Sequence, residues 1–343
     1  MIRFNNDYNR GAHETIIKKI AETNSYQICS YGEDEYCKEA SNIIKNLCKK
    51  PSADVHFLVG GTQTNLTVIS SALKPYQCVV SASTGHINGH ETGAIEATGH
   101  KVYAIDTEDG KLTASMVQAA YNDHWNDENH EHIAQPKLVY ISNPTETGTI
   151  YSKNELESLY TVCRQCGLYL YIDGARLSYG LASEKNDLDF ESIASNCDVF
   201  YIGGTKCGAL FGEAVVILND SLKEDFRYII KQKGGLLAKG WLLGIQFTEL
   251  LKDGLYIKLA ENADRLAAKI KEAVLKEGYM LYSQSYTNQQ FIIFPDDLIE
   301  KLKNKYTISY QQKYDSTHSV IRICTDWATN EEDIDLFIRD IKK

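Results

Sequence analysis

The chain has 343 residues, of which 43% are hydrophobic and 24% charged, a composition typical of a soluble globular protein with about two domains. Its formal net charge of −10 makes nucleic acids and anionic membrane surfaces poor candidates as partners. No apolar stretch approaches the roughly 20 residues that span a bilayer, and the polar residues after Met1 argue against a cleavable leader. Nine scattered cysteines, an odd number, predict reduced thiols and a cytoplasmic location.

Short apolar runs alternate with helical patterns along the first two thirds of the chain, which is typical of a parallel sheet wrapped by crossover helices. The runs predict strands at Val55–Val59, Cys78–Val80, Val102–Ile105, Leu138–Ser142, Leu168–Ile172, Val199–Ile202 and Ala214–Leu218. Amphipathic spacing predicts helices at Asn65–Leu73, Ala114–Trp125 and Lys153–Cys166. Because the runs are almost continuously apolar, we expect strands that are covered on both faces.

The pattern changes after about residue 220, where long amphipathic segments predict helices at Ser221–Lys233, Gly240–Lys252 and Tyr256–Glu277. A strand–helix–strand–helix tail follows through Gln290–Phe294, Leu298–Lys303, Val320–Ile323 and Glu331–Ile341. We therefore predict an α/β protein with a large, mostly parallel sheet domain over residues 14–245. A smaller C-terminal α/β domain would cover residues 246–343, with residues 1–13 as an N-terminal arm.

The turn after the first predicted strand has the sequence Gly60-Gly61-Thr62 and precedes a helix. In open parallel sheets, ligands bind outside the carboxyl ends of the strands. The two glycines permit a tight turn, and the amides at the helix start point outward, which favours a bound phosphate. An ordinary strand-to-helix turn explains the sequence equally well, and the spacing fits neither GxxxxGK[ST] nor GxGxxG.

The second predicted strand leads into Thr84-Gly85-His86, whose imidazole is placed to stack on an aromatic ligand. The alternative is a buried histidine held by hydrogen bonds. Zinc bound by His86 and His90 is disfavoured, because the spacing lacks the internal glutamate of HExxH and Gly89 weakens a helix. We therefore expect no metal at this position.

Two charged residues follow the fifth and sixth runs. Asp173 ends an apolar strand, where a buried acid needs either an ion pair with Arg176 or the protonated ring nitrogen of a cofactor. Lys206 follows glycines at the mouth of the sheet, where desolvation favours the neutral amine that forms a Schiff base with an aldehyde. With the phosphate turn and the stacking histidine, these residues predict a pocket for pyridoxal 5'-phosphate.

In these residues the chain resembles the low-specificity L-threonine aldolases, which belong to the β-eliminating lyase group of fold type I pyridoxal-phosphate enzymes. The resemblance covers essentially the whole chain and is carried by Phe57-Leu58-Val59-Gly60-Gly61-Thr62-Gln63-Thr64-Asn65, Thr84-Gly85-His86, Asp173-Gly174-Ala175-Arg176 and Gly204-Thr205-Lys206. It implies a fold type I, transferase-like α/β architecture. It also implies a pyridoxal-phosphate-dependent lyase that cleaves L-threonine or L-allo-threonine to glycine and acetaldehyde.

The resemblance implies a role for each matching position. Lys206 would carry the internal aldimine, Asp173 would keep the ring nitrogen protonated, and His86 would stack on the ring. Further contacts are implied for Gly61, Thr62 and Thr205 with the phosphate, and for Arg176, Arg322 and Asn6 with the substrate carboxylate, Arg176 also lying against the cofactor. Tyr31 and the Gly234–Lys239 loop would reach the neighbouring subunit's site in a homodimer or homotetramer.

The chain departs from the family's pattern at two positions near the substrate. Glu146, in the Asn143–Gly148 loop, stands where better-known relatives carry a histidine linked to the substrate hydroxyl. Either Glu146, with a pKa raised by burial, or His86, directly or through water, is then the base for the β-hydroxyl proton. Lys239 stands near where relatives often show an arginine at the phosphate, without the arginine's bidentate fork.

Three other functions remain open from the sequence. A lyase of the same fold that acts on a different β-hydroxy or aromatic amino acid fits the same motifs. An aminotransferase is a further candidate. A non-catalytic protein that binds cofactor or a partner is disfavoured, because it needs neither an imine-forming lysine nor a pair of arginines that hold a carboxylate.

Overall fold

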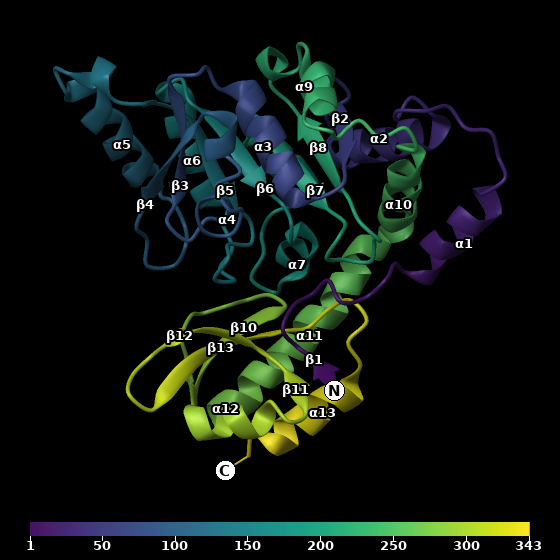
Figure 1. Cartoon of the computed structure of the whole chain (residues 1–343), viewed down its shortest axis with the longest axis vertical. Helices are drawn as coiled ribbons and strands as arrows, with labels where there is room; N and C mark the ends of the chain where they lie inside the picture. The colour runs from purple at the N-terminus through teal and green to yellow at the C-terminus, as the bar shows by residue number, and fades with distance from the viewer. Residues whose placement is uncertain (343) are drawn as a thin grey trace.

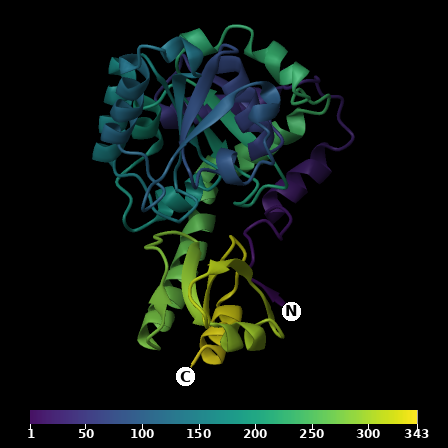
Figure 2. The same ribbon diagram turned by 60° about the vertical axis from the view of Figure 1, so that its left-hand side comes forward.

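The computed structural model describes residues 1–342 and shows a larger and a smaller α/β part (Figure 1). The long helix α11, Leu255–Lys276, runs from the larger part into the smaller one, as the second view also shows (Figure 2). No helix in this described part of the chain is both long and apolar enough to cross a membrane.

The larger part is built on a seven-stranded sheet with the order β2-β8-β7-β6-β5-β3-β4. Its strands are β2 (Asp54–Leu58), β3 (Gln77–Ala82), β4 (Lys101–Ile105), β5 (Gln135–Ser142), β6 (Tyr169–Asp173), β7 (Val199–Gly203) and β8 (Glu213–Ile217). Each predicted strand is present, and the mostly parallel sheet is confirmed. Only β8 runs against its neighbours β2 and β7. Residues 204–212 are too few for the crossover of about a dozen residues that a parallel strand requires.

Both faces of this sheet carry an apolar core, as the continuous apolar runs predicted. On β6, Leu170 and Ile172 belong to one core and Tyr169 and Tyr171 to the other, because side chains alternate along a strand. The first core includes residues of α1 (Glu14–Thr23), α2 (Glu35–Cys48), α5 (Ala114–Asn126), α6 (Lys153–Gln165), α7 (Leu177–Ala182), α8 (Phe190–Ser195) and α10 (Trp241–Leu251). The second includes residues of α3 (Gly61–Ala72), α4 (His86–Gly89) and α9 (Phe226–Gln232).

The smaller part combines the C-terminal residues with the start of the chain. Its antiparallel sheet has the order β12-β13-β10-β9, formed by β9 (Met280–Leu281), β10 (Gln289–Pro295), β12 (Ser309–Lys313) and β13 (His318–Cys324). Helices α12 (Asp296–Leu302) and α13 (Glu331–Asp340) pack with α11 on one core. The N-terminal strand β1 (Ile2–Arg3) pairs in parallel with β11 (Tyr306–Thr307), and Phe4 enters that core. The division of the chain at residues 245 and 246 stays a prediction.

Three predicted helices differ from the observed ones. Helix α3 begins at Gly61 rather than at Asn65, which places Gly61 and Thr62 in its first turn. Helix α9 covers only the second half of the predicted Ser221–Lys233 segment, because Asp225 adopts a positive φ of 59° before it. The amphipathic prediction for Gly240–Lys252 is wrong: residues Leu243–Leu251 of α10 are all buried, since this helix lies against α2 and also meets α1 and α11.

Candidate active site

A cavity of about 170 Å³ collects residues from the carboxyl ends of β2, β5, β6 and β7 and from the start of β8. It is lined by most of the site residues predicted from the sequence, namely Gly61, Thr62, His86, Glu146, Asp173, Arg176, Thr205 and Lys206. Because the parallel strands all end at this edge of the sheet, residues far apart in the sequence meet here.

The N-terminus of α3 faces this cavity with its first amides free of a side-chain cap. Gly60 is the N-cap residue and offers no side chain to accept hydrogen bonds, and a Cβ at Gly60 would have no atom within 4 Å. The uncapped amides of Gly61 and Thr62 and the positive end of the helix dipole suit an anion. Across the cavity, the Thr205 hydroxyl accepts from the N–H of Gly212 at 2.9 Å and donates to Glu213 at 3.0 Å, so its O–H would turn from Glu213 to bind a phosphate. These groups fit the phosphate of pyridoxal phosphate.

Asp173, at the end of β6, is a buried carboxylate surrounded by hydrogen-bond donors. It accepts hydrogen bonds from the hydroxyls of Tyr201 at 2.5 Å and Tyr140 at 2.6 Å and from the amide of Asn65 at 3.0 Å. Burial alone raises its pKa, but the charge of His86 and the two phenolic donors outweigh burial and lower it below the ordinary value. Asp173 is therefore ionised and able to hold a cationic ring nitrogen.

Arg176 does not pair with Asp173, which removes that alternative for the acid. Its Nε and Nη2 instead donate to the two carboxylate oxygens of Asp7, at 2.7 and 2.9 Å. The amide of Asn288, from the smaller part, donates to Asp7 at 2.9 Å. The N-terminal arm thus fixes the orientation of Arg176 by a bidentate ion pair that is buried on the Asp7 side.

Lys206 follows β7 and reaches the cavity without a partner for its amine. The amine forms no ion pair or hydrogen bond with residues 1–342. Burial and the positive charge of Arg176 lower its pKa, although Asp7, Asp173 and Glu213 act in the opposite direction. A lowered pKa and the lack of an ion-pair partner among the described residues both favour the neutral amine, the form that reacts with an aldehyde to give an imine.

His86 is the first residue of α4, and a carboxylate holds its ring. Nδ1 of His86 lies 2.7 Å from Oε1 of Glu91, and the Asn65 amide donates to the same oxygen at 2.7 Å. Burial lowers the pKa of His86, but the Glu91 hydrogen bond and the charges of Glu91 and Asp173 raise it overall. The ring is therefore fixed in the cavity wall in a setting that favours its charged form.

Glu146 lies in the loop after β5 and contacts the backbone of His86. Its Oε1 accepts hydrogen bonds from the His86 N–H at 2.9 Å and from the Ser142 hydroxyl at 2.6 Å. Burial raises the pKa of Glu146, and the charge of Asp173 adds to this effect. A cavity-lining carboxyl with a raised pKa is a candidate for proton transfer.

Arg322 and Asn6 lie where the arm meets the smaller part, and neither lines the cavity. Arg322, on β13, donates from Nη2 to the Asn5 carbonyl at 3.0 Å and from Nη1 to Gln289 at 3.3 Å. Its Nε is buried and has no hydrogen-bond partner in the described part of the chain. Asn6 is buried, and its side chain accepts a hydrogen bond from the N–H of Tyr8 at 3.1 Å. Arg322 therefore retains a donor for a further acceptor.

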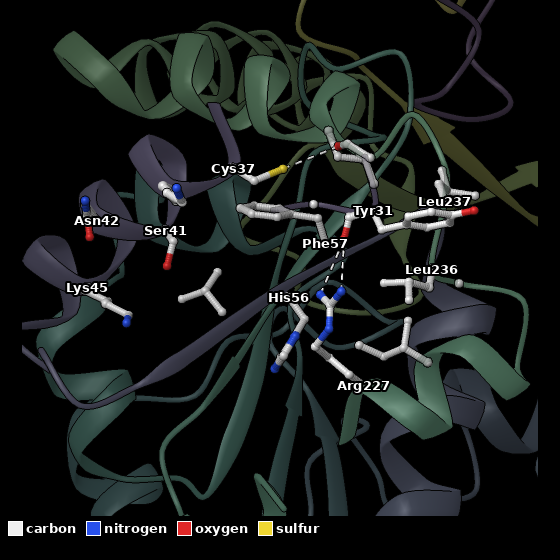
Figure 3. Close-up of a pocket in the computed structure, with 17 residues that line it drawn as sticks. Tyr31, Cys37, Ser41, Asn42, Lys45, His56, Phe57, Arg227, Leu236 and Leu237 are labelled. Atoms are coloured by element: carbon white, nitrogen blue, oxygen red, sulfur yellow. Dashed lines mark hydrogen bonds between the residues drawn. The ribbon is translucent and has the colours of Figure 1, made fainter. Parts of the chain in front are cut away.

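Tyr31 and Lys239 are not brought to the cavity within one chain. Tyr31 instead lines a second cavity of about 400 Å³, beside Arg227, which donates to the Tyr31 carbonyl (Figure 3). Lys239 is exposed. The two segments are nevertheless neighbours, since the Tyr31 N–H donates to the Ala238 carbonyl at 3.2 Å.

Sequence reasoning missed three acids that the structure places at the site: Asp7, Glu91 and Glu213. Asp7 stands beside the predicted Asn6, and Glu91 stands beside His90, which the sequence suggested only as a disfavoured zinc ligand. Nothing in one sequence shows which arginine or histidine these two acids contact. Glu213 follows a glycine and directly precedes the predicted strand Ala214–Leu218, and an acid beside an apolar run was the available signal.

The chain matches the family model described as beta-eliminating lyase over residues 14–297. A curated low-specificity L-threonine aldolase from Pseudomonas aeruginosa is 30% identical over 331 residues, which cover 94% of this chain and 92% of the relative. A solved structure of Leishmania major threonine aldolase is 45% identical, covers 99% of this chain and 98% of its own, and superposes with a TM-score of 0.96.

The fold itself extends to more distant structures. An aspartate aminotransferase mutant from Thermus thermophilus superposes with a TM-score of 0.72 at 14% identity, covering 99% of this chain and 90% of its own. This likeness concerns the fold alone, and it confirms the predicted transferase-like α/β architecture.

Proposed function

Because the chain belongs to the beta-eliminating lyase family, we propose that it cleaves L-threonine or L-allo-threonine to glycine and acetaldehyde. The chain is a pyridoxal-phosphate-dependent lyase, as the sequence predicted, and an amino acid is its substrate. The main support for this proposal is that one cavity is lined by the unpaired Lys206, the ionised Asp173 and the start of α3. The threonine aldolases of Pseudomonas aeruginosa and Leishmania major support the choice of substrate.

Pyridoxal phosphate, when bound, supplies an aldehyde for a lysine amine and a ring that accepts the electron pair of a bond broken at the amino acid's α-carbon. The amides of Gly61 and Thr62 and the hydroxyl of Thr205 would hold its phosphate. Asp173 would keep a proton on the ring nitrogen, and His86 would cover the ring. Lys206 would supply the amine that reacts with the aldehyde, and its lowered pKa favours the neutral form that this reaction needs.

The substrate carboxylate would be held by Arg176 and Arg322, with Asn6 beside them. Arg176 donates to Asp7 from one edge only, so Nη1 remains to bind a second carboxylate. The unpartnered Nε of Arg322 supplies another donor. Two cations fix the rotation of the amino acid about its α-carbon and thereby select the bond to the β-carbon for cleavage.

Glu146 would take the proton from the β-hydroxyl of the substrate. Burial shifts the pKa of Glu146 towards neutral pH, which makes its carboxylate a stronger base than that of an ordinary glutamate. His86 is less suited to this task, because Glu91 raises its pKa and favours the charged imidazole, which holds no free electron pair. The structural setting therefore favours Glu146 over His86.

The proposal includes a homodimer or homotetramer in which Tyr31 and Lys239 reach the neighbouring site. The surface around Tyr31 carries exposed aromatic side chains: Tyr31 itself is 41% exposed and Tyr228 is 76% exposed. Lys231 lies 4.9 Å from the centre of the Tyr31 ring, which orients that side chain at the surface. A cytoplasmic location also belongs to the proposal and is supported by cysteines that are all free.

The competing function is a lyase of the same family that acts on another β-hydroxy or aromatic amino acid. To separate the two, the protein is loaded with pyridoxal phosphate and given L-threonine, L-allo-threonine, L-phenylserine, L-tyrosine and L-cysteine in turn. We expect an aldehyde from the β-hydroxy substrates, with acetaldehyde fastest, and no release of pyruvate. Benzaldehyde from L-phenylserine without acetaldehyde from either threonine, or pyruvate from cysteine or tyrosine without any aldehyde, would assign the competing function.

A further inference from the structure

Glu213 occupies a position between the two turns assigned above to the cofactor's phosphate. It is the first residue of β8 and is paired in register with Leu58 of β2 and Gly203 of β7, the last residues of those strands. The turn after β2 provides Gly61, and the turn after β7 provides Thr205. Glu213 lines the same cavity as both turns.

The carboxyl of Glu213 is buried, and only one of its two oxygens accepts a hydrogen bond from the described residues. The residue is 3% exposed, and its Oε1 accepts a hydrogen bond from the Thr205 hydroxyl at 3.0 Å. Oε2 is buried and has no hydrogen-bond partner within residues 1–342. No lysine or arginine of the described residues forms an ion pair with Glu213, so the charge of this carboxylate is not neutralised by a contact.

The groups that face Glu213 come from several elements. Lys206 follows β7 and Asp173 ends β6, and these are the charged groups that act on its ionisation, with opposite signs. The phenols of Tyr171, Tyr201 and Tyr256 also lie within electrostatic range. The charge of Lys206 therefore favours the ionised form of Glu213, while the charge of Asp173 disfavours it. A bound phosphate would add negative charge and disfavour the ionised form further.

We propose that Glu213 binds a proton when the phosphate of the cofactor enters the cavity, so that phosphate binding and protonation of Glu213 are coupled. The inference rests on the proposed function, which assigns the phosphate to the turns around Glu213. The proton comes from solvent and adds to the carboxylate, and no other bond changes. The resulting acid offers an O–H donor to a phosphate oxygen, where a carboxylate would repel the phosphate dianion in a desolvated space.

The ionisation of Glu213 in the ligand-free protein makes this coupling measurable. Burial raises the pKa of Glu213 to about 8, even though Lys206 and the Thr205 hydrogen bond act to lower it. Below this pH the acid is already protonated, and above it the proton must be taken up on binding. Affinity for a phosphate ligand therefore falls as the pH rises through about 8.

The alternative is that Glu213 stays ionised and serves only to neutralise Lys206. In that case the phosphate would bind without uptake of a proton by Glu213. The two accounts differ in the number of protons bound, which is independent of enzymatic activity.

The test uses isothermal titration calorimetry of the full chain at pH 8.5, in two buffers of different ionisation enthalpy. The probes are pyridoxine 5'-phosphate and pyridoxine, neither of which carries an aldehyde that reacts with Lys206. For the unaltered protein we expect the phosphate probe to take up roughly half to one proton more than pyridoxine does. For the unaltered protein, the apparent dissociation constant of the phosphate probe should rise about tenfold between pH 7 and pH 9. Glu213→Gln should show neither the extra proton uptake nor this rise.

Glu249→Gln is the matched control, because Glu249 is also buried but pairs with Lys252 outside the cavity. It should retain the proton uptake. Equal proton uptake by the unaltered protein and by Glu213→Gln would overturn the inference. Binding of the phosphate probe to the unaltered protein without extra proton uptake would also overturn it, and this result needs no variant. Failure of pyridoxine 5'-phosphate to bind would contradict the proposed function itself, and the inference would fall with it.

Discussion

Oε1 of Glu91 lies 2.7 Å from Nδ1 of His86 and forms the start of a hydrogen-bond network behind the cavity. The Asn65 amide donates to the same oxygen at 2.7 Å and to Asp173 at 3.0 Å. The residue proposed to cover the cofactor ring is thereby connected to the residue proposed to hold the ring nitrogen. Glu91 is thus a positioning residue that fixes His86 through Nδ1.

Replacing Glu91 by glutamine should lower the pKa of His86, because the neutral amide no longer stabilises the imidazolium. A hydrogen bond to a charged group contributes about 1.5–3 kcal/mol, which corresponds to a fall in kcat/KM of roughly tenfold to a hundredfold. The His86 titration is measured by NMR and kcat/KM by steady-state kinetics. Glu96→Gln, an exposed position ten residues away from His86 in the chain, is the control. An unchanged titration of His86 in Glu91→Gln would refute the positioning role.

Asp7→Asn should both destabilise the protein and raise KM for L-threonine. The substitution leaves the largely buried Arg176 without its carboxylate, a change that typically costs about 3–5 kcal/mol. It also frees Arg176 to leave the orientation that suits a substrate carboxylate, so KM should rise more than kcat falls. Urea denaturation and steady-state kinetics measure the two effects. Glu331→Gln, which breaks an exposed and solvent-screened ion pair, should change stability far less than Asp7→Asn does.

The contribution of Asp7 to stability should depend on pH in a defined direction. Burial raises its pKa, but the charges of Arg176 and Lys206 and two hydrogen bonds lower it below the ordinary 3.8. A carboxyl with a lowered folded-state pKa stabilises the protein above its unfolded pKa, and this contribution is lost as the pH falls through the folded value. The difference in unfolding free energy between wild type and Asp7→Asn should therefore be constant from pH 5 to 7 and shrink below about pH 4. A difference that grows on acidification would contradict the assignment.

Glu146→Gln should remove the base for the β-hydroxyl proton and lower kcat by roughly a hundredfold to ten-thousandfold. Because burial raises the pKa of Glu146, the wild type should lose kcat/KM on acidification at a pH above that of an ordinary glutamate. The variant should lack this acidic limb of the pH profile. His86→Asn serves as the comparison, since it leaves Glu146 in place. Full activity of Glu146→Gln would show that another group takes the proton.

Gly148→Ala should disturb the loop that carries Glu146. Gly148 has a φ of 82°, and a Cβ there would overlap the side chain of Ser285 in the smaller part. Overpacking of this kind costs about 1–3 kcal/mol, so we expect that loss of stability together with a fall in kcat. Gly254→Ala is the matched control, because Gly254 has a φ of 70° but no atom of the described residues would lie within 4 Å of a Cβ there. Equal losses in the two variants would show that the contact with Ser285 is unimportant.

Much of the sheet and several site residues could be predicted from the sequence. Buried parallel strands appear in the sequence as apolar runs, and the carboxyl ends of these strands lie at one edge of the sheet. Asp173 stands directly after one such run and Lys206 lies in the short glycine-containing turn after the next, so the topology predicts that the two residues meet. The reversal of β8 was also within reach of the sequence, since residues 204–212 are too few for a crossover helix. The buried α10 was not, because the α2 surface that covers it is distant in the chain.

The acids that support the site could not be assigned from the sequence. Asp7 is separated from Arg176 by most of the larger part, and only the folded arm brings the two together. Glu213 is one of 46 acidic residues, and only its register with Leu58 and Gly203 shows that it belongs to the cavity. Such contacts depend on tertiary geometry, which local patterns do not encode.

The cavity around Lys206 is proposed to cleave L-threonine between its α- and β-carbons. The most direct test is to quantify glycine and acetaldehyde released from L-threonine by the protein loaded with pyridoxal phosphate, beside Lys206→Ala treated in the same way. We predict equal amounts of the two products from the wild type and only background release from Lys206→Ala. Absence of acetaldehyde with the wild type, or undiminished release by Lys206→Ala, would contradict the account.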